Sequence, residues 1–217
     1  MNEISLDESK KIKLFNRKET KYKCSFLEYC CIIKYLYDNY LIVTNNNNTL
    51  FSYVSIYFDT NDLIMYNEHK NDKINRQKIR VREYDNGEKY LEIKKKTEDH
   101  HTIKTRIPID NVDINNNFNW IKDNLKYKVD NLQNVLNVRY KRMTFISKNK
   151  LERITIDIDI EFFNQLNNIS KKINDIIIEI KEEGNHRSSF HKILNSFNIY
   201  ECKFSKYFNG LTYTMNE

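Results

Sequence analysis

The chain has 217 residues, with 36 Lys or Arg against 30 Asp or Glu and a net charge of +6 at pH 7. This length fits one domain, expected over residues 1–217, and the basic excess favours an anionic partner. No apolar run approaches the ~18 residues of a membrane-spanning helix, and the start of the chain does not resemble a signal peptide. Four cysteines without CxxC spacing predict reduced thiols and a cytoplasmic location.

Alternation of polar and apolar residues predicts eight strands. In chain order they lie at residues 17–22, 54–59, 77–84, 89–96, 101–109, 137–147, 151–163 and 175–183. Helices are expected at 26–37, 118–137, 188–197 and 203–213. Ser25 and Glu28 form a capping box ahead of the first helix. The asparagine run at 45–48 predicts a disordered loop, and the polar stretch 61–75 predicts a connection with a helical turn.

The polar positions of these strands share one face, because successive side chains of a strand point to opposite faces. That face repeats Arg and Lys with carboxylates between them, whereas the other face is aliphatic. The residues that share it are Arg80 and Arg82; Glu92, Lys94 and Lys96; Arg153, Thr155, Asp157 and Asp159; and Glu179 and Lys181. Arg139 and Lys141 fall on the face opposite Arg142 and are expected outside the site.

Such charged faces do not pack together as the core of a sandwich. We therefore expect an α+β fold built on a closed, eight-stranded antiparallel β-barrel, with aliphatic residues outward beneath helices and charged residues inward around a wet tunnel. The cations expected in this tunnel are Lys21, Arg80, Arg82, Lys94, Arg142, Arg153 and Lys181. The carboxylates expected among them are Glu19, Glu92, Asp157, Asp159 and Glu179.

A tunnel lined in this way requires an anionic ligand. Two like charges ~5 Å apart repel by roughly 3 kcal/mol at an effective dielectric of ~20, and the carboxylates offset only part of this. Guanidinium groups bind phosphate oxygens in a bidentate manner, and carboxylates in the same space bind Mg²⁺ or Mn²⁺. Because only three glycines are present, a glycine-rich phosphate loop is excluded and side chains must hold the phosphate. Asp157 and Asp159 are equally well explained as structural partners of arginines.

Eight short motifs also carry a family resemblance. They lie at residues 17–22, 55–60, 78–84, 91–94, 140–145, 153–157, 178–181 and 203–207. In this order they resemble the VTC domain, which is the polyphosphate polymerase branch of the triphosphate tunnel metalloenzymes. The most branch-specific of them is Lys-x-Ser-Lys, which ends at Lys206.

The resemblance implies a role for each matching residue. Phosphate would be bound by Lys21, Arg80, Arg82, Lys94, Arg142, Arg153, Lys181, Lys203, Ser205 and Lys206. Arg80, Arg82 and Lys206 would be catalytic, and Glu179 would bind the metal, Mn²⁺ or Mg²⁺. The superfamily motif Glu-x-Glu-x-Lys is incomplete here, because Arg17 stands two places before Glu19, and this predicts fewer metal ligands. Ser205 is also explained as a helix-capping serine.

The implied reaction transfers the terminal phosphate of ATP to a growing inorganic polyphosphate chain. The expected partners are ATP and polyphosphate or pyrophosphate, and no nucleic acid is expected. One alternative is a metal-dependent triphosphatase acting on tripolyphosphate, thiamine triphosphate, a nucleoside triphosphate or an RNA 5′ end, with water oriented by Glu92 or Glu179. Others are a polyphosphate-binding module without activity and a nucleic-acid binder, since basic strands with tyrosines also bind a phosphate backbone.

Overall fold

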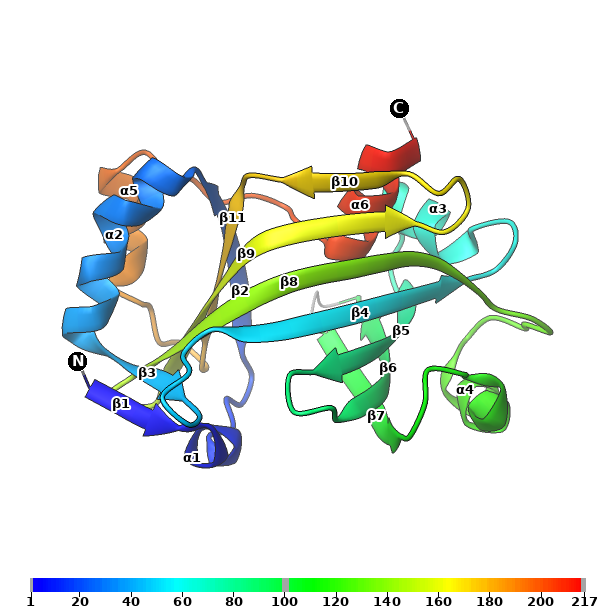
Figure 1. Ribbon diagram of the computed structural model, residues 1–217, viewed down its shortest axis with the longest axis horizontal. Coiled ribbons are helices and arrows are strands. Elements are labelled where there is room, and N and C mark those ends of the chain that lie inside the picture. Colours follow the sequence, from blue (N-terminus) through cyan, green and yellow to red (C-terminus); the bar gives the residue numbers. More distant parts are fainter. Residues whose placement is uncertain (1, 99–101, 216–217) are drawn as a thin grey trace. The chain divides into compact units, whose positions relative to one another are not determined.

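The computed structural model describes residues 2–98 and 102–215 (Figure 1). Its contacts divide the chain into two compact units. Unit 1 comprises Met1–Ser52, Tyr140–Ile160 and Ile173–Phe204, and unit 2 comprises Tyr53–Arg139, Glu161–Lys172 and Ser205–Glu217. Both units draw on the long strands β8 (Gln133–Ser147) and β9 (Glu152–Asn164). The single domain expected from the length stays a prediction.

Unit 1 combines strands with two helices on one side of them. Besides its parts of β8 and β9, it contains β1 (Asn2–Ser5), α1 (Leu6–Lys11), β2 (Lys18–Cys24), α2 (Phe26–Asn39), β3 (Tyr40–Thr44), β11 (Ile176–Glu182) and α5 (Phe190–Ser196). The predicted capping box begins α2: the Ser25 Oγ accepts from the Glu28 N–H, and the Glu28 carboxylate accepts from the Ser25 N–H at 2.7 Å. It satisfies two of the backbone donors that a helix start leaves without partners.

Unit 2 is built around a second set of strands. It holds most of β4 (Phe51–Asp59), then α3 (Ile64–Lys70), β5 (Gln77–Tyr84), β6 (Lys89–Lys96), β7 (Thr102–Ile109), a 3₁₀ turn (Asn115–Asn117), α4 (Phe118–Asn124), most of β10 (Ser170–Ile173) and α6 (Lys206–Met215). The hairpin of β5 and β6 has the predicted bounds, and it turns through Gly87 at φ +82°. Within the described ranges, no helix is both long and apolar enough to cross a membrane.

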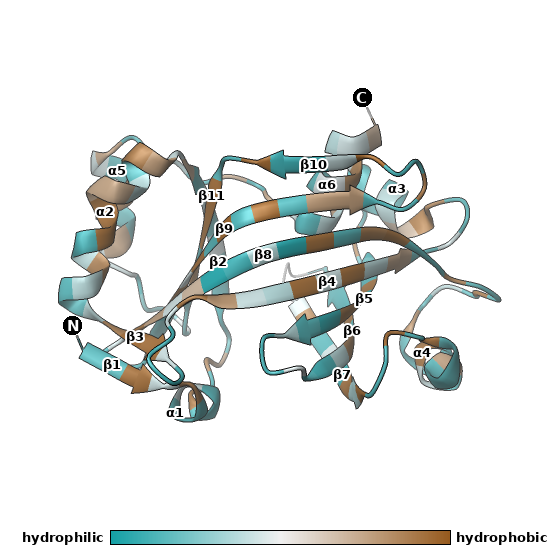
Figure 2. Ribbon diagram, viewed as in Figure 1, coloured by the Kyte–Doolittle hydropathy of each residue, from teal (hydrophilic) through white to brown (hydrophobic). Residues whose placement is uncertain are grey.

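The strands pair in the order β2-β11-β9-β8-β4-β5-β6-β7, and β1, β3 and β10 attach beside this path. The register is antiparallel between β11 and its two neighbours and throughout β4 to β7. Polar and apolar residues alternate along β4, β8 and β9, as the teal and brown bands of Figure 2 show. The predicted α+β class and the eight-stranded antiparallel sheet are therefore confirmed, whereas the tunnel stays a prediction.

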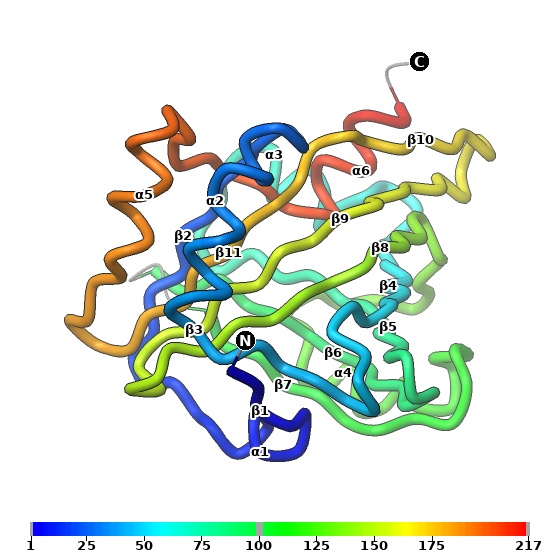
Figure 3. Tube along the Cα trace, turned by 60° about the vertical axis from the view of Figure 1, so that its left-hand side comes forward, coloured from blue at the N-terminus to red at the C-terminus, as the bar shows by residue number. Residues whose placement is uncertain are grey.

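The core of unit 1 lies between its sheet and the helices α2 and α5. Ile32 and Leu36 of α2 pack with Phe190 of α5 against the aliphatic side chains of β9 and β11, such as Ile156 and Ile178, and all five are buried. Both helices lie on the same side of these strands (Figures 1 and 3). Burial of each such side chain contributes about 1.5–3 kcal/mol. The helices thus cover the aliphatic face and leave the polar face of the strands for the site.

The helix predicted over 118–137 is wrong beyond its first two turns. The helix ends at Asn124, where Leu125 turns to an extended conformation, and β8 already begins at Gln133. Val135 and Val138 are fully buried in this strand. β-branched residues and asparagines favour a helix weakly, and pairing within the sheet decides the conformation.

The asparagine run at 45–48 forms a turn instead of the predicted disordered loop. The backbone N–H of Asn45 donates to the carbonyl of Asn48 at 3.0 Å, and the reverse bond is 2.9 Å. Between them, Asn46 and Asn47 have φ of 49° and 62°. Two central residues with positive φ characterise the tight turns of hairpins, and asparagine adopts this conformation more readily than most residues.

Candidate functional site

The polar face of unit 1 is arranged in rows across its strands. Lys21 of β2 stands opposite Glu179 of β11, and Glu179 stands opposite Thr155 of β9. In the next row, Glu19, Lys181 and Arg153 follow one another across the same strands. The predicted sharing of one face is therefore correct for these residues, and Lys21 and Glu19 of β2 each stand opposite a residue of the other charge on β11.

A bidentate ion pair on this face joins β8 to β9. The Arg142 guanidinium donates from Nε and one terminal nitrogen to the two oxygens of Asp157, at 2.5 and 2.8 Å. Both side chains are largely buried, at 13% and 3% exposure. Asp157 therefore orients the guanidinium of Arg142, which is the structural alternative that its sequence pattern left open. Glu179 forms a looser pair with Lys181, at 3.2 Å.

Two of the predicted phosphate-binding cations contact backbone carbonyl groups. The Arg153 guanidinium donates to the carbonyl oxygens of Ser9 and Ile12, at 2.9 and 3.1 Å. The Lys21 ammonium donates to the carbonyl of Phe204 at 2.7 Å. These cations hold the N-terminal segment and the segment before α6 onto the strands of unit 1.

Asp159 does not share the face of Asp157, so this prediction is wrong. Its backbone has φ of +52°, which interrupts the regular alternation of β9. Its carboxylate lies 3.2 Å from the Lys141 ammonium, and both side chains are close to half exposed. Because Lys141 neighbours Arg142 along β8, Asp159 lies on the other face of the strand.

The polar face of unit 2 is centred on a buried ion pair. The Arg80 guanidinium donates twice to one oxygen of Glu92, at 2.9 and 2.6 Å, and once to the Tyr57 hydroxyl at 3.1 Å. The Lys104 ammonium donates to the other oxygen of Glu92 at 2.7 Å. The Arg80 and Glu92 side chains are 6% and 0% exposed. Arg80 is therefore fixed in position from both sides.

This environment sets the protonation of Glu92. Burial by itself raises the pKa of the carboxyl group, but Arg80, Arg82 and Lys104 lower it by more, so the net pKa lies well below its usual range. Glu92 is thus a carboxylate whose two oxygens are both engaged by cations. Such a group is a weak base, which argues against the predicted role of Glu92 in activating water.

Lysines stand directly opposite one another in the next row of unit 2. Lys78 of β5 is paired in register with Lys94 of β6, and Lys94 is paired with Lys104 of β7. Like charges directly opposite on neighbouring strands are destabilising. Arg82, the remaining predicted arginine, is partly exposed and donates to the Ser55 hydroxyl at 3.4 Å. These cations give the polar face of unit 2, as far as the structure describes it, a strongly basic character.

The segment that begins α6 contains the last three predicted residues. The Ser205 hydroxyl accepts from the Phe208 N–H at 3.4 Å, which is the geometry of a helix cap. The Lys78 ammonium also lies 3.5 Å from this hydroxyl. Lys206 is the first residue of the helix, and Lys203 is exposed. The capping role that the sequence allowed for Ser205 is therefore present.

The sequence was compared with models of known protein families. A model of the VTC domain matches residues 16–215. The chain belongs to the VTC domain family. The resemblance carried by the eight motifs is thereby confirmed.

A solved structure supports the fold of this VTC domain. The putative adenylyl cyclase HpAC1 from Hippeastrum, described as having a dominant triphosphatase activity, is 15% identical with a TM-score of 0.56, over 88% of this chain and 94% of that one. A conserved hypothetical protein from Pyrococcus furiosus is 10% identical with a TM-score of 0.47, over 84% and 92%. A search of curated proteins found no match. At these identities the likeness to HpAC1 concerns the fold.

Sequence reasoning missed several cations and partners of this VTC domain. Lys104 and Arg106 lie on β7, two positions apart, and Lys78 precedes Arg80 by two. All three follow the alternation that identified Arg80 and Arg82, so the signal was present in the sequence. Tyr57 carried no such signal, because its contact with Arg80 depends on the register of β4 against β5.

The carboxylates of this VTC domain fit a metal only in part. Among the residues described, no three His, Cys, Asp or Glu side chains are grouped as a metal site. Glu179 can offer carboxylate oxygens, and it is bordered by Lys181 and Lys21. Mg²⁺ is commonly held by one or two carboxylates together with substrate phosphates. The donor set therefore fits a metal that is shared with a phosphate ligand.

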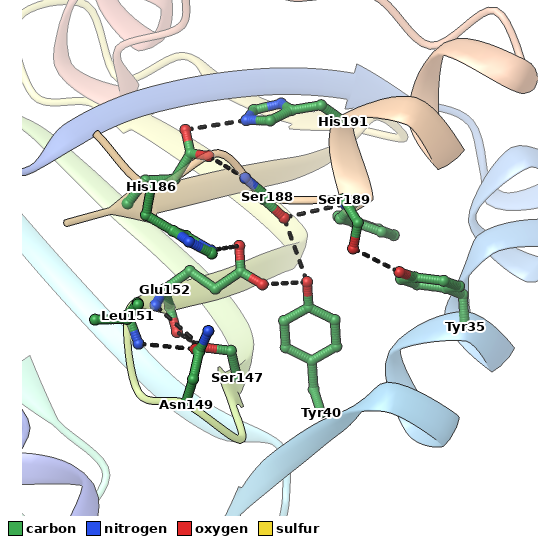
Figure 4. A network of polar contacts seen from close by, with 12 residues as sticks. Tyr35, Tyr40, Ser147, Asn149, Leu151, Glu152, His186, Ser188, Ser189 and His191 are labelled. Carbon is green, nitrogen blue, oxygen red and sulfur yellow. Dashed lines mark hydrogen bonds and ion pairs between the residues drawn. The ribbon is translucent and has the colours of Figure 1, made fainter. Parts of the chain in front are cut away.

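A second polar group lies on the helix-covered face of unit 1 (Figure 4). Glu152 accepts a hydrogen bond from the Tyr40 hydroxyl and lies 3.3 Å from the Nε2 of His186. Glu182, opposite Glu152 on the neighbouring strand, lies 3.0 Å from the Nε2 of His191. This network ties the end of α2 and the start of α5 to the sheet, so both histidines have a structural role.

Proposed function

We propose that this VTC domain binds the phosphates of ATP and transfers the terminal phosphoryl group to a growing inorganic polyphosphate chain. The row of Lys78, Lys94 and Lys104 beside Arg80 and Arg82 supports this proposal most directly. Neighbouring cations repel each other, and a bound anion lowers this repulsion. A linear string of phosphates presents one negative group after another, and so matches a row of cations.

The cations of unit 2 would position the phosphates and stabilise the negative charge that develops during transfer. Arg80 is held by Glu92 and Tyr57, so its guanidinium needs little reorganisation when charge develops on the leaving diphosphate. Arg82 is less constrained, and its guanidinium can turn toward a phosphate oxygen. Phosphoryl transfer depends mainly on such positioning and electrostatics. The acceptor phosphate is already an anion near neutral pH, so no strong base is needed.

The carboxylate of Glu179 is suited to binding a divalent metal. On the polar face of unit 1, Glu179 would hold it together with oxygens of a phosphate chain. Bound there, Mn²⁺ or Mg²⁺ would neutralise charge on the phosphates. Lys21 and Lys181, which border Glu179, would orient the phosphate oxygens nearest to it.

Hydrolysis of a triphosphate is the second candidate. It is favoured by the shared fold with HpAC1, a protein described as a dominant triphosphatase. The same cations would bind the substrate, and water would replace the phosphate acceptor. Because Glu92 is held by two cations, it is a poor candidate for orienting that water.

Analysis of the products distinguishes these functions. We expect purified protein with ATP and Mn²⁺ to form acid-labile chains longer than triphosphate. Arg82→Ala and Lys206→Ala should each lower the rate by roughly 100-fold, as is typical for loss of a group that stabilises developing charge. The matched control is Arg139→Ala, which removes an exposed arginine of β8 and should change the rate less than twofold.

Two other outcomes decide against polymerisation, and a third decides against the site. ADP and orthophosphate without any polyphosphate indicate the triphosphatase. Binding of ATP without turnover under any divalent metal indicates a binding module. Equal loss of activity in Arg82→Ala and Arg139→Ala contradicts the assignment of the polar face as the site.

A further inference from the structure

Three tyrosines gather at one end of the polar face of unit 2. Tyr53 of β4 is paired in register with Tyr84 of β5, with ring centroids 5.3 Å apart and planes inclined by 63°. Tyr84 also meets Tyr90 of β6, at 5.7 Å and 82°. We call Tyr53, Tyr84 and Tyr90 the tyrosine cluster. Neither the phosphate-binding role nor the buried ion pair explains it.

The cluster continues the same face as the arginines. Arg82 lies two positions before Tyr84 on β5, and it is paired in register with Tyr90. Positions two apart on a strand are separated by about 6.6 Å. The carbon at the centre of the Arg82 guanidinium lies 5.9 Å from the Tyr53 ring centroid, and that of Arg106 lies 4.5 Å from the Tyr90 ring centroid. Aromatic rings and guanidinium groups therefore alternate at the end of the phosphate-binding rows.

Exposure distinguishes this cluster from the aromatic core. Tyr57, on the same face of β4, is 1% exposed and stacks on Tyr207 at 5.2 Å. The rings of Tyr53, Tyr84 and Tyr90 are only partly buried. A tyrosine that served the core alone would be covered in the same way as Tyr57.

We propose that the tyrosine cluster is a stacking site for the base of a nucleoside triphosphate whose phosphates extend along Arg82, Arg80 and Lys78. This inference rests on the proposed function, since it requires that triphosphates bind to this face. Nucleobases stack on aromatic rings and on guanidinium planes. An extended nucleotide separates its base from its first phosphate by about the length of one two-residue repeat of a strand. Because every base has an aromatic face, stacking predicts little preference between ATP and GTP.

The test compares a ligand that has a base with one that lacks it. The β,γ-imido analogue of ATP and inorganic tripolyphosphate are each titrated with Mn²⁺, and apparent affinities are obtained from the ligand-induced rise of the melting temperature. We expect Tyr84→Ala and Tyr90→Ala to weaken the ATP analogue roughly tenfold and to leave tripolyphosphate within about twofold. Tyr84→Phe, which keeps the ring, should bind both ligands as the wild type does.

Controls separate stacking from a structural role. Cross-strand tyrosine pairs also stabilise a sheet, so Tyr90→Leu is included to keep apolar bulk without an aromatic ring. Tyr200→Ala removes an exposed tyrosine of unit 1 and should alter neither affinity. Equal weakening of both ligands, or of neither, in the Tyr84 and Tyr90 variants overturns the stacking site and leaves the proposed function intact. A wild type that binds neither ligand overturns both.

Discussion

At the scale of single residues, Glu92 shows how strongly a buried charge depends on its partners. Glu92→Gln would leave the buried Arg80 guanidinium without its counter-ion. Breaking a buried pair by removal of one partner typically costs about 3–5 kcal/mol, so we expect a loss of that size in the free energy of unfolding, measured with urea. Glu83→Gln is the control, because the Glu83–Lys89 pair is at the surface, with 37% of the Glu83 side chain exposed, and should change stability by less than about 1 kcal/mol.

The same variant also tests the protonation of Glu92. The folded pKa of Glu92 lies well below its unfolded value, which is about 4.3. The ionised carboxylate therefore contributes stability fully above the unfolded pKa, and this contribution falls as the pH drops below it toward the folded pKa. Between about pH 5 and pH 3, the wild type should lose stability more steeply than Glu92→Gln. Equal slopes would show that Glu92 is not a buried ionised partner of Arg80.

At the scale of elements, Gly210 reports on the packing of α6. A Cβ at this position would lie 2.5 Å from the Phe162 ring and 2.7 Å from the Leu136 side chain. Overpacking of this kind costs about 1–3 kcal/mol, although alanine favours a helix over glycine by about 1 kcal/mol. We expect Gly210→Ala to lower the melting temperature. Gly184→Ala, where an added Cβ would meet no atom within 4 Å but φ is +56°, tests backbone strain alone, and a stabilised Gly210→Ala would contradict the close contact.

The helices and strands also show which local sequence signals are enough to predict their bounds. The hairpin of β5 and β6 was predicted with correct bounds, because its alternation and its Asn-Gly turn are local features. The extension of α4 toward residue 137 was wrong, because β8 gains its stability from strands that are distant in the sequence. The bend at Asp159 was missed for a related reason. The pattern of polar and apolar residues does not reveal a positive φ within a strand.

At the scale of the whole molecule, the excess of cations predicts an unusual response to salt. Salt screens repulsion between exposed charges, with a Debye length of about 10 Å at 0.1 M and about 3 Å at 1 M. We expect the melting temperature of the protein without ligand to rise between about 0.05 and 0.5 M NaCl. Bound tripolyphosphate should abolish this rise, because it neutralises the same cations. A melting temperature that is insensitive to salt, or equally sensitive with and without tripolyphosphate, would show that the lysine row carries little repulsion.

The sequence by itself determined the α+β class, the two-faced character of the strands, the order of the family motifs and the identity of most cations on the polar faces. All of these follow from short-range periodicity and side-chain chemistry. Only the tertiary structure decided the partner of each charge: Arg142 pairs with Asp157, Arg80 with Glu92, and Arg153 and Lys21 with backbone carbonyls. These partners depend on strand register and on contacts between residues as many as 183 positions apart, which no local pattern encodes.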